Sequence, residues 1–381
     1  MSLFAWITVI PLAAWLYLAL LRGFFWRTDV RLEPEGPPEQ WPSVAVVVPA
    51  RDEQEVLGAT LAALLAQDYA GRAQIIIVDD QSTDGTADLA VRLGSAAEAR
   101  LPLVVVSGSD TPPGWTGKLW ALAQGVARAG DVDFVLLTDA DIRHPQDSLS
   151  RLVSTATAHG LDQVSLMARL RAVSRAERLV VPAFVYFFAQ LYPFRWVGRG
   201  RTAAAAGGCL LVRRSALERA GGLEAIRGAI IDDVTLAGAL RRSGSRLWLG
   251  FADDVESVRS YGGLAELWRM VSRSAFTQLR YSAVLLAGTV IGLAFIFLVP
   301  PAAVIAGVVT GDAPLAGIGL LAWAVMTATY VPMLSYYRLP RRAALLLPVT
   351  AGLYTLMTID SALQHWRGGV AWKGRRYVGA P

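Results

Sequence analysis

The chain has 381 residues, of which 54% are hydrophobic and only 18% are charged, and its formal net charge is +5. This composition is too apolar for a purely soluble protein, and the single cysteine, Cys209, excludes an internal disulfide and a cysteine-clustered zinc site. With only three scattered histidines, carboxylates are the expected ligands of any metal. Many basic residues lie beside apolar runs, as Arg22 does, which indicates lipid headgroups or membrane topology, so we expect no nucleic-acid partner.

The first apolar run, residues 3–21, carries no charge and is followed by Arg22 and Arg27. Its length of roughly 20 residues suits a membrane-spanning helix. A secretory signal would carry its positive charge before the apolar run, not after it. We therefore predict a transmembrane anchor over 1–22, with the amino terminus outside and the following residues inside, and a linker over 23–42.

Residues 43–280 mix charged and apolar residues as a globular domain does. Short apolar, β-branched runs that suit buried parallel strands lie at Val44–Val48, Ile75–Val78, Leu103–Val106 and Phe134–Leu137. Patterns with helical spacing separate them, at 53–67, at about 86–93 and from about 118. Alternating strands and helices predict an α/β fold with a doubly wound, mostly parallel sheet whose ligands bind at the carboxyl ends of the strands.

One stretch inside this domain, residues 179–197, is rich in aromatic residues and contains Pro182 and Pro193. Two interpretations are open for it. It is either an interfacial helix pressed into the headgroup layer or a buried helix of the core. A lipid substrate would favour the interfacial helix.

Three more apolar stretches make residues 281–363 a region of transmembrane or interfacial helices. They cover about 283–309, 314–335 and 343–359. Counting spans from a cytoplasmic domain places the last segment, 364–381, outside, yet this tail carries Arg367, Lys373, Arg375 and Arg376. Either one apolar stretch is re-entrant or interfacial, or the rule that positive loops stay inside fails locally.

Three acidic clusters follow predicted strands or apolar runs, where such a fold places its ligand. They are Asp79-Asp80, Asp139-Ala-Asp141 and Asp232-Asp233. Two carboxylates separated by one residue point to the same side of an extended segment and can share a divalent cation with a diphosphate. Each cluster alone also has an ordinary explanation, as a turn, a chance pair or a helix cap. Their order on one scaffold favours a site, beside which His144 is expected to be a loop residue and not a ligand.

In these motifs the sequence resembles the family 2 inverting glycosyltransferases of the GT-A fold. The resemblance rests on PARDE at 49–53, VDDQSTDGT at 78–86, GK-x-x-A at 117–121, TDAD at 138–141 and IDD at 231–233. The longer segments GWTGKLWAL, TAAAAGGCLLVRRSALERAGG, RGAIIDD and YGGLAELWRM look like the hopene-associated glycosyltransferases. These are bacterial membrane enzymes linked to hopanoid lipid metabolism.

The resemblance implies a role for each matching position. A nucleotide base and ribose pocket is implied at Pro49, Ala50, Arg51, Glu53 and Asp80, and further donor contacts at Lys118 and Asp139. Asp139 and Asp141 would hold Mg²⁺ or Mn²⁺, with Asp141 preferred as the direct ligand. Asp233 would be the general base and Asp232 an orienting carboxylate, while Gly207 and Gly208 would let the backbone approach the sugar or acceptor.

The sequence departs from the family downstream of these motifs. Processive and ceramide-type relatives often carry Q-x-x-R-W, whereas this chain reads WRMVSRSAFTQLRYS. Arg269 and Arg273, or Gln278 and Arg280, would take that role, and we expect Arg269 or Arg273 to help neutralise the leaving group.

These observations predict a metal-dependent glycosyltransferase. Its donor is expected to be a nucleotide-sugar, with a UDP-sugar implied by the family resemblance, and its acceptor a lipid hydroxyl of hopanoid type. We expect a multi-pass protein of the bacterial inner membrane whose catalytic domain faces the cytoplasm. Two alternatives stay open. A polyprenyl-phosphate glycosyltransferase would carry the same motifs. A non-catalytic membrane scaffold that binds a nucleotide-sugar would have no need of the intact DAD and IDD motifs and Lys118.

Overall fold

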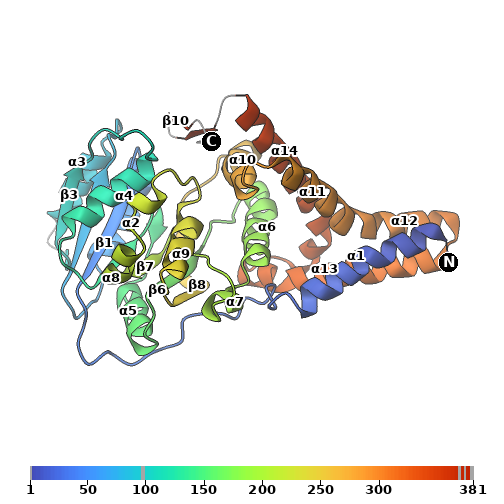
Figure 1. Cartoon of the computed structure of the whole chain (residues 1–381), viewed down its shortest axis with the longest axis horizontal. Helices are drawn as coiled ribbons and strands as arrows, with labels where there is room; N and C mark the ends of the chain where they lie inside the picture. Colours follow the sequence, from blue (N-terminus) through green and yellow to red (C-terminus); the bar gives the residue numbers. More distant parts are fainter. Residues whose placement is uncertain (1, 96–98, 368–369, 373–374, 378–381) are drawn as a thin grey trace.

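The computed structural model describes residues 2–95, 99–367, 370–372 and 375–377. An α/β domain lies at one end of the molecule and a narrow bundle of long helices at the other (Figure 1). Helices α6 (Arg175–Leu191) and α10 (Leu264–Gln278) lie between the two.

The α/β domain is built on a mixed sheet of eight strands among the described residues, in the order β3-β2-β1-β4-β7-β6-β8-β5. The strands are β1 (Val44–Ala50), β2 (Ala73–Asp79), β3 (Leu103–Ser107), β4 (Phe134–Leu137), β5 (Ile142–Arg143), β6 (Gln163–Arg169), β7 (Leu210–Arg213) and β8 (Leu247–Ser257). Strands β3, β2, β1 and β4 pair in parallel, whereas β7 is antiparallel to both β4 and β6. The predicted α/β fold is confirmed, and the four predicted strands lie at β1 to β4.

The helices of this domain cover both faces of the sheet. They are α2 (Gln54–Leu65), α3 (Thr86–Gly94), α4 (Gly117–Arg128), α5 (Ser148–Ala158), α7 (Phe194–Gly198), α8 (Arg214–Arg219) and α9 (Asp232–Arg242).

Alternate residues of β1 enter two different cores, because side chains alternate across a strand. Val46 packs in the core that includes α2, and Val47 packs in the core that includes α4. Both faces of β1 are therefore dry, which explains its unbroken apolar run.

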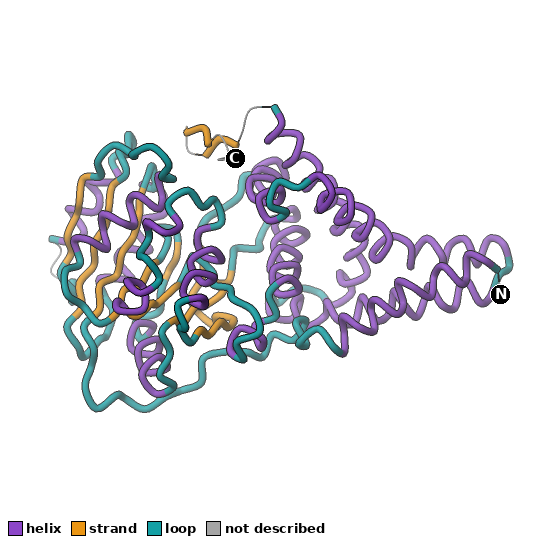
Figure 2. The backbone as a smooth tube through the Cα atoms, viewed as in Figure 1, coloured by secondary structure: helices purple, strands orange, loops and turns teal. Residues whose placement is uncertain are grey.

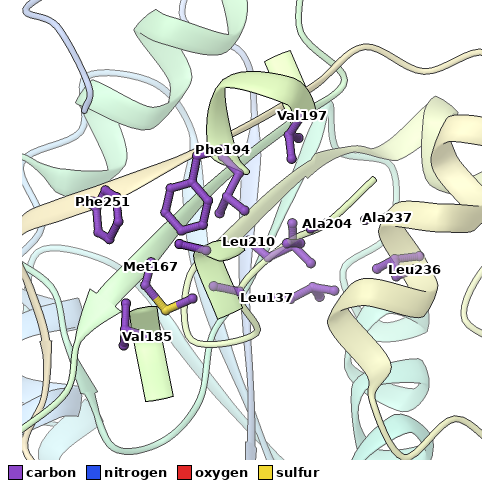
Figure 3. Packing of buried hydrophobic residues seen from close by; sticks show 14 of the residues in the cluster. Leu137, Met167, Val185, Phe194, Val197, Ala204, Leu210, Leu236, Ala237 and Phe251 are labelled. Carbon is purple, nitrogen blue, oxygen red and sulfur yellow. The ribbon is translucent and has the colours of Figure 1, made fainter. Parts of the chain in front are cut away.

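Figure 3 shows how this core fixes the helix that carries the third acidic cluster. Leu137, Leu210 and Met167 extend from the strands toward side chains of α6, α7 and α9, including Leu236 and Ala237. Leu236 is 2% exposed and Ala237 is fully buried. The buried face of α9 therefore holds its first turn, with Asp232, in a fixed position beside the end of β4.

Gly125 marks the close approach of α4 to the sheet. A Cβ atom at this position would lie 2.3 Å from Val47 Cγ1 and 3.1 Å from Val78 Cγ2. Although alanine favours a helix over glycine by about 1 kcal/mol, overpacking a filled core costs about 1–3 kcal/mol. We expect Gly125→Ala to lower the free energy of unfolding, measured as a lower unfolding temperature in detergent.

Gly58 provides the matched control for this prediction. It lies in α2, and a Cβ atom there would have no neighbour within 4 Å. Gly58→Ala is therefore expected to leave the unfolding temperature unchanged or to raise it. Equal stability of the Gly125→Ala protein and the native chain would contradict the proposed packing.

Among the described residues, four helical segments are long and apolar enough to cross a membrane. They are α1 (Leu3–Leu20), the kinked segment formed by α11 (Ala283–Leu293), η2 (Ala294–Leu298) and α12 (Val299–Thr310), then α13 (Ala313–Tyr336), and η3 (Arg341–Leu346) with α14 (Leu347–Trp366). The purple coils of Figure 2 show α1, α12 and α13 running together toward the amino-terminal tip.

The kink has an identifiable cause. Pro300 has no N–H group to donate to the carbonyl of Ile296 four residues earlier, so the helix changes to the π form over Ala294–Leu298. The indole Nε1 of Trp15 donates to that same Ile296 carbonyl at 2.9 Å. Helix α1 thus supplies the hydrogen bond that the proline removes.

The aromatic stretch at 179–197 forms most of α6 and all but the last residue of α7. Val180, Val185 and Tyr186 are fully buried. The hydroxyl of Tyr186 lies 2.7 Å from Thr329 Oγ1 on α13. For the face of α6 that carries these three residues, the interpretation as a buried core helix is therefore the correct one.

The basic tail is described only in part. Lys373 lies outside the described residues, whereas Arg375 and Arg376 belong to β10 (Arg375–Tyr377), which pairs with β9 (Val370–Trp372). The limits given above for the anchor, linker, catalytic domain and tail stay predictions.

Candidate functional site

The site lies at the carboxyl end of β4, where two acidic clusters meet one lysine. The ammonium of Lys118, in the first turn of α4, lies 2.8 Å from Asp139 Oδ1 and 3.0 Å from Asp232 Oδ2. These side chains are only 20–34% exposed. The two carboxylates raise the pKa of Lys118 above its usual value in spite of the opposing effect of burial. The structure therefore brings the second and third clusters together, with Lys118 as a permanent cation between them.

Asp233 lies next to this contact and is held by the backbone. Its Oδ2 accepts a hydrogen bond from the Gly207 N–H at 2.8 Å, and its Oδ1 accepts one from the Val234 N–H at 2.8 Å. Burial, reinforced by the negative charge of Asp232, raises the pKa of Asp233 to about 7. The helix-cap explanation of this cluster does not hold, since Ile231 occupies the N-cap and no side chain caps it. Asp233 is thus a carboxylate that can take up or release a proton near neutral pH.

Asp141 is held by a residue that the sequence patterns did not identify, Arg259. The Nε of Arg259 lies 3.0 Å from Asp141 Oδ2, and its Nη2 contacts both carboxylate oxygens of Glu53 at 2.8 and 2.6 Å. Ser257 Oγ donates to the same Asp141 oxygen at 2.9 Å. Arg259 follows the end of β8 in a segment without a recognisable motif. Glu53 is therefore tied to the second acidic cluster.

The charges of this region are unequal. Its carboxylates are Glu53, Asp139, Asp141, Asp232 and Asp233, and its cations are Lys118 and Arg259. Five carboxylates against two cations give a formal charge of −3 when all are ionised. Burial, with the nearby charges of Asp141 and Asp232, raises the pKa of Asp139 in spite of Lys118.

This charge excess fits a divalent cation. Among the described residues, no group of three or more His, Cys, Asp or Glu side chains is arranged to hold an ion alone. Mg²⁺ and similar ions are commonly bound by one or two carboxylates, and water and substrate phosphates complete the shell. Asp139 and Asp141 are the residues that would hold such an ion, and the ion would supply positive charge for a diphosphate.

The residues expected to line a nucleotide pocket lie at the ends of β1 and β2. Arg51 Nη1 donates to the Asp80 carbonyl at 2.6 Å, and the Asp80 N–H donates to the carbonyl of Ala50 at 2.7 Å. The Asp80 side chain is only 5% exposed. Two hydroxyls that the motif analysis did not single out join these loops, because the backbone N–H groups of residues 52 and 53 donate to Ser82 and Thr86. Pro49 and Ala50 are the last two residues of β1.

Thr138 joins the end of β4 to the glycine loop, and His144 contacts Thr138 from the other side. Its Nε2 lies 2.8 Å from Thr138 Oγ1 and its Nδ1 lies 3.1 Å from Ser148 Oγ. Thr138 Oγ1 in turn donates to the carbonyl of Gly208 at 2.7 Å. Burial lowers the pKa of His144 to about 4, so the ring is neutral at pH 7. His144 therefore orients the Thr138 hydroxyl that holds the loop of Gly207 and Gly208.

The arginine alternatives on α10 differ in their surroundings. Arg269 is exposed and its Nε donates to the carbonyl of Ala265 on its own helix, while Arg273 is near Tyr261. Gln278 Nε2 lies 2.5 Å from the hydroxyl of Tyr192. Burial raises the pKa of Tyr192, and the charge of Asp233 adds to this effect, whereas Arg280 opposes it. Tyr192 thus links the second pair, Gln278 and Arg280, to the part of the site that contains Asp233.

Comparison with known proteins shows which family this chain resembles. The family model described as "Glycosyltransferase like family 2" matches residues 42–278. An N-acetylglucosaminyltransferase of Mesorhizobium japonicum is 32% identical over 145 residues, which are 38% of this chain and 32% of that protein. An undecaprenyl-phosphate 4-deoxy-4-formamido-L-arabinose transferase of Photorhabdus laumondii is 30% identical over 124 residues, which are 31% of this chain and 35% of that protein. The chain thus spans about a third of the length of these curated relatives.

A solved structure shares the fold over nearly the whole chain. The mannosyltransferase PcManGT from Pyrobaculum calidifontis, solved with GDP-mannose and Mn²⁺, has a TM-score of 0.53 and 20% sequence identity. The similarity covers 95% of this chain and 98% of that chain. Since the family model matches more than half of the chain and the fold agrees, this protein belongs to glycosyltransferase family 2 and has the GT-A fold.

Proposed function

We propose that this protein is an inverting, metal-dependent glycosyltransferase that moves a sugar from a nucleotide-sugar, in the first place a UDP-sugar, to the hydroxyl of a membrane lipid. The observation that carries the proposal is the contact of Lys118 with both Asp139 and Asp232, at 2.8 and 3.0 Å. This contact joins the carboxylates suited to a diphosphate-bound cation with the helix turn that presents Asp233. The residues that we propose for the leaving-group site and for the base thus lie side by side.

The reaction would be a single displacement. Asp233 takes the proton of the acceptor hydroxyl as the oxygen attacks the anomeric carbon, and the bond to the nucleoside diphosphate breaks on the opposite side of the sugar. One displacement inverts the anomeric configuration. Asp232 and Lys118 fix the turn that carries Asp233, and the Gly207 N–H orients one of its oxygens. Asp139 and Asp141 would hold a divalent cation that neutralises the charge of the departing diphosphate. Glu53 and Arg259 hold Asp141 in place.

A lipid acceptor is supported by the helices that surround the site. Tyr192, at the end of α6, contacts Gln278 at the end of α10, and both helices pack against α14. An enzyme acting on a soluble sugar needs no such setting, whereas a lipid presents its hydroxyl at the headgroup layer. We therefore place the catalytic domain on the cytoplasmic face of a bacterial inner membrane. The resemblance of the long segments to the hopene-associated enzymes favours a hopanoid-type acceptor.

A polyprenyl phosphate is the second candidate acceptor. The Photorhabdus laumondii relative, by its name, transfers a sugar to undecaprenyl phosphate. In this case a phosphate oxygen, already ionised, would attack without needing a base, and the role of Asp233 would diminish.

The deciding experiment is transfer of radiolabelled sugar by the purified full chain in detergent. UDP- and GDP-sugars are each offered with hopanoid lipids or with undecaprenyl phosphate, in the presence of Mg²⁺, Mn²⁺ or EDTA. We expect metal-dependent labelling of a hopanoid-type lipid from a UDP-sugar. Label in undecaprenyl phosphate alone would select the second candidate. If no donor gives a labelled lipid although the nucleotide still binds, the result would support the non-catalytic membrane scaffold.

The raised pKa of Asp233 predicts the acidic limb of the pH profile. With a pKa of about 7, Asp233 is protonated below that pH and cannot accept a proton from the acceptor. The rate of transfer is therefore expected to fall about tenfold per pH unit below about pH 6 and to level off above about pH 8. The check is a profile of kcat/KM from pH 5 to 9 with the metal held at saturation. A rate that stays constant down to pH 5 would exclude Asp233 as the base.

A further inference from the structure

The four apolar helical segments do not all reach the far end of the molecule. Helices α1, α12 and α13 run side by side to the tip marked N in Figure 1, whereas α14 turns away from them and ends close to α10. At the tip, Ala5 of α1, Ala303 of α12 and Leu315 of α13 form one small core. The opposite ends of α1 and α13 contact the catalytic side: Arg22 Nε donates to the Gln190 carbonyl at the end of α6, and the Tyr336 hydroxyl donates to the Ala252 carbonyl of β8.

Helix α14 contacts α6 and α10 on the catalytic side, and it also packs against α11 and η2 of the kinked segment. It follows η3, which begins only five residues after α13 ends beside β8. In its middle, the Tyr354 hydroxyl donates to the Val180 carbonyl of α6 at 3.0 Å. Near its end, Ser361 Oγ accepts a hydrogen bond from the Phe276 N–H of α10 at 3.0 Å, and the His365 ring stacks on the Tyr281 ring at 4.4 Å.

Length alone does not distinguish α14 from a spanning helix. Its 20 residues would extend about 30 Å, which equals the hydrocarbon thickness of a bilayer. A spanning helix would have to place one end near Thr310 and Asp312, at the tip. In this structure η3, which leads into α14, packs against α13, and the other end of α14 lies beside Tyr281 instead. Asp360 within α14 also accepts a hydrogen bond from Trp268 of α10, so a charge that is costly inside a bilayer has its partner on the catalytic side.

The exposed side of α14 is apolar from end to end. Val349, Leu356 and Leu363 follow one another at seven-residue spacing and are 57%, 54% and 38% exposed, and Trp366 is 58% exposed. The opposite side is buried against α10, α11 and α6. Exposed arginines stand at both ends, at Arg341 and Arg342 before the helix and at Arg367 after it. An apolar stripe with basic flanks suits the boundary between lipid tails and anionic headgroups.

We propose that α14 does not cross the membrane but lies against its surface on the catalytic side, with the stripe of Val349, Leu356, Leu363 and Trp366 in contact with lipid. The chain then crosses three times, through α1, the kinked α11–α12 segment and α13. With three crossings the basic residues of the tail stay on the side of the catalytic domain, as the positive-inside rule requires. The proposal rests on membrane insertion and is independent of the sugar chemistry.

Single-cysteine labelling of the full chain tests this topology. Cys209 is buried, so the native chain gives a low background with a membrane-impermeant maleimide. The introduced positions are Thr310→Cys at the tip, Arg342→Cys before α14 and Arg367→Cys after it. In sealed vesicles of known orientation, we expect Arg342→Cys and Arg367→Cys to react from the same side and Thr310→Cys from the opposite side. Reaction of Arg367→Cys from the Thr310 side would overturn the proposal, and reaction of all three from one side would refute insertion itself.

A spin label at Leu356→Cys tests what covers the stripe. If lipid covers the stripe, the spin label should collide with oxygen, which is enriched in lipid, more often than with a water-soluble nickel complex. The matched control is Glu218→Cys on α8, where the native side chain is 61% exposed and water should reach the label. A label at 356 that is protected from both reagents would show that a protein, such as a second copy of this chain, covers the stripe, and would overturn the lipid contact.

Discussion

Replacing Asp233 with Asn is expected to lower sugar transfer to a lipid hydroxyl by roughly 10²–10⁴-fold, the usual contribution of a positioned general base. The amide keeps the size of the side chain and one carbonyl oxygen for the Gly207 N–H, so the loop should keep its place. It has no basic oxygen for the acceptor proton. The loss should therefore fall on kcat, while the dissociation constant of the nucleotide-sugar changes little.

The measurement combines initial rates with donor binding by calorimetry in detergent. Asp254→Asn is the control, because Asp254 is a half-exposed carboxylate that pairs with Arg151 away from the cluster. Its rate should equal that of the native chain. A rate of the Asp233→Asn protein within tenfold of the native rate would remove Asp233 from the role of base and would favour an acceptor that is already ionised.

Replacing Lys118 with Gln is expected to have the second largest effect. The amide leaves Asp139 and Asp232 without the ammonium that lies 2.8 and 3.0 Å from them, and the formal charge of the region becomes −4. Since these side chains are only partly exposed, we expect a loss of about 1–3 kcal/mol in the free energy of unfolding. Donor affinity should also fall, because the diphosphate then approaches a more negative surface.

A divalent cation should offset part of this loss, which separates the prediction from a general packing defect. Adding Mg²⁺ or Mn²⁺ is expected to raise the unfolding temperature of the Lys118→Gln protein more than that of the native chain. Lys118→Arg, which keeps the charge, should keep more of the stability. If Mg²⁺ and Mn²⁺ stabilise both proteins equally, the carboxylates that Lys118 contacts do not form the metal site.

The α/β half of the molecule could be predicted from local patterns. Strands β1, β2 and β4 are largely buried, whereas β3 is half-buried at the edge of the sheet, and the apolar runs of all four begin within two residues of the observed starts. Strands β6, β7 and β8 were not singled out because their residues alternate less and because antiparallel pairing across β7 leaves no local mark. The acidic motifs were visible since each lies within three residues of a strand end or at a helix start.

The rest of the site depends on contacts between distant segments. Arg259 lies 206 residues from Glu53 and 118 from Asp141, and no spacing rule links the three. The raised pKa of Asp233 depends on burial and on Asp232, and sequence alone gives neither the burial nor the direction of its side chain. The same holds for α14, whose length and composition match a spanning helix and whose course is set by its contacts with α6 and α10.

The hydrogen bond between Trp15 and the Ile296 carbonyl means that the first helix is more than a tether. Within hydrocarbon, an unpaired carbonyl costs several kcal/mol, because no water is present to replace the lost partner. An unrelated spanning sequence in place of residues 3–20 would keep the enzyme at the membrane and yet leave the bend at Pro300 without its support. Such an anchor swap should therefore loosen the hairpin of α12 and α13, and with it the seating of Tyr336 against β8. If evolution replaced this helix by another of equal hydrophobicity, the tryptophan at position 15 would have to be kept, whereas the lipid-facing positions could vary freely.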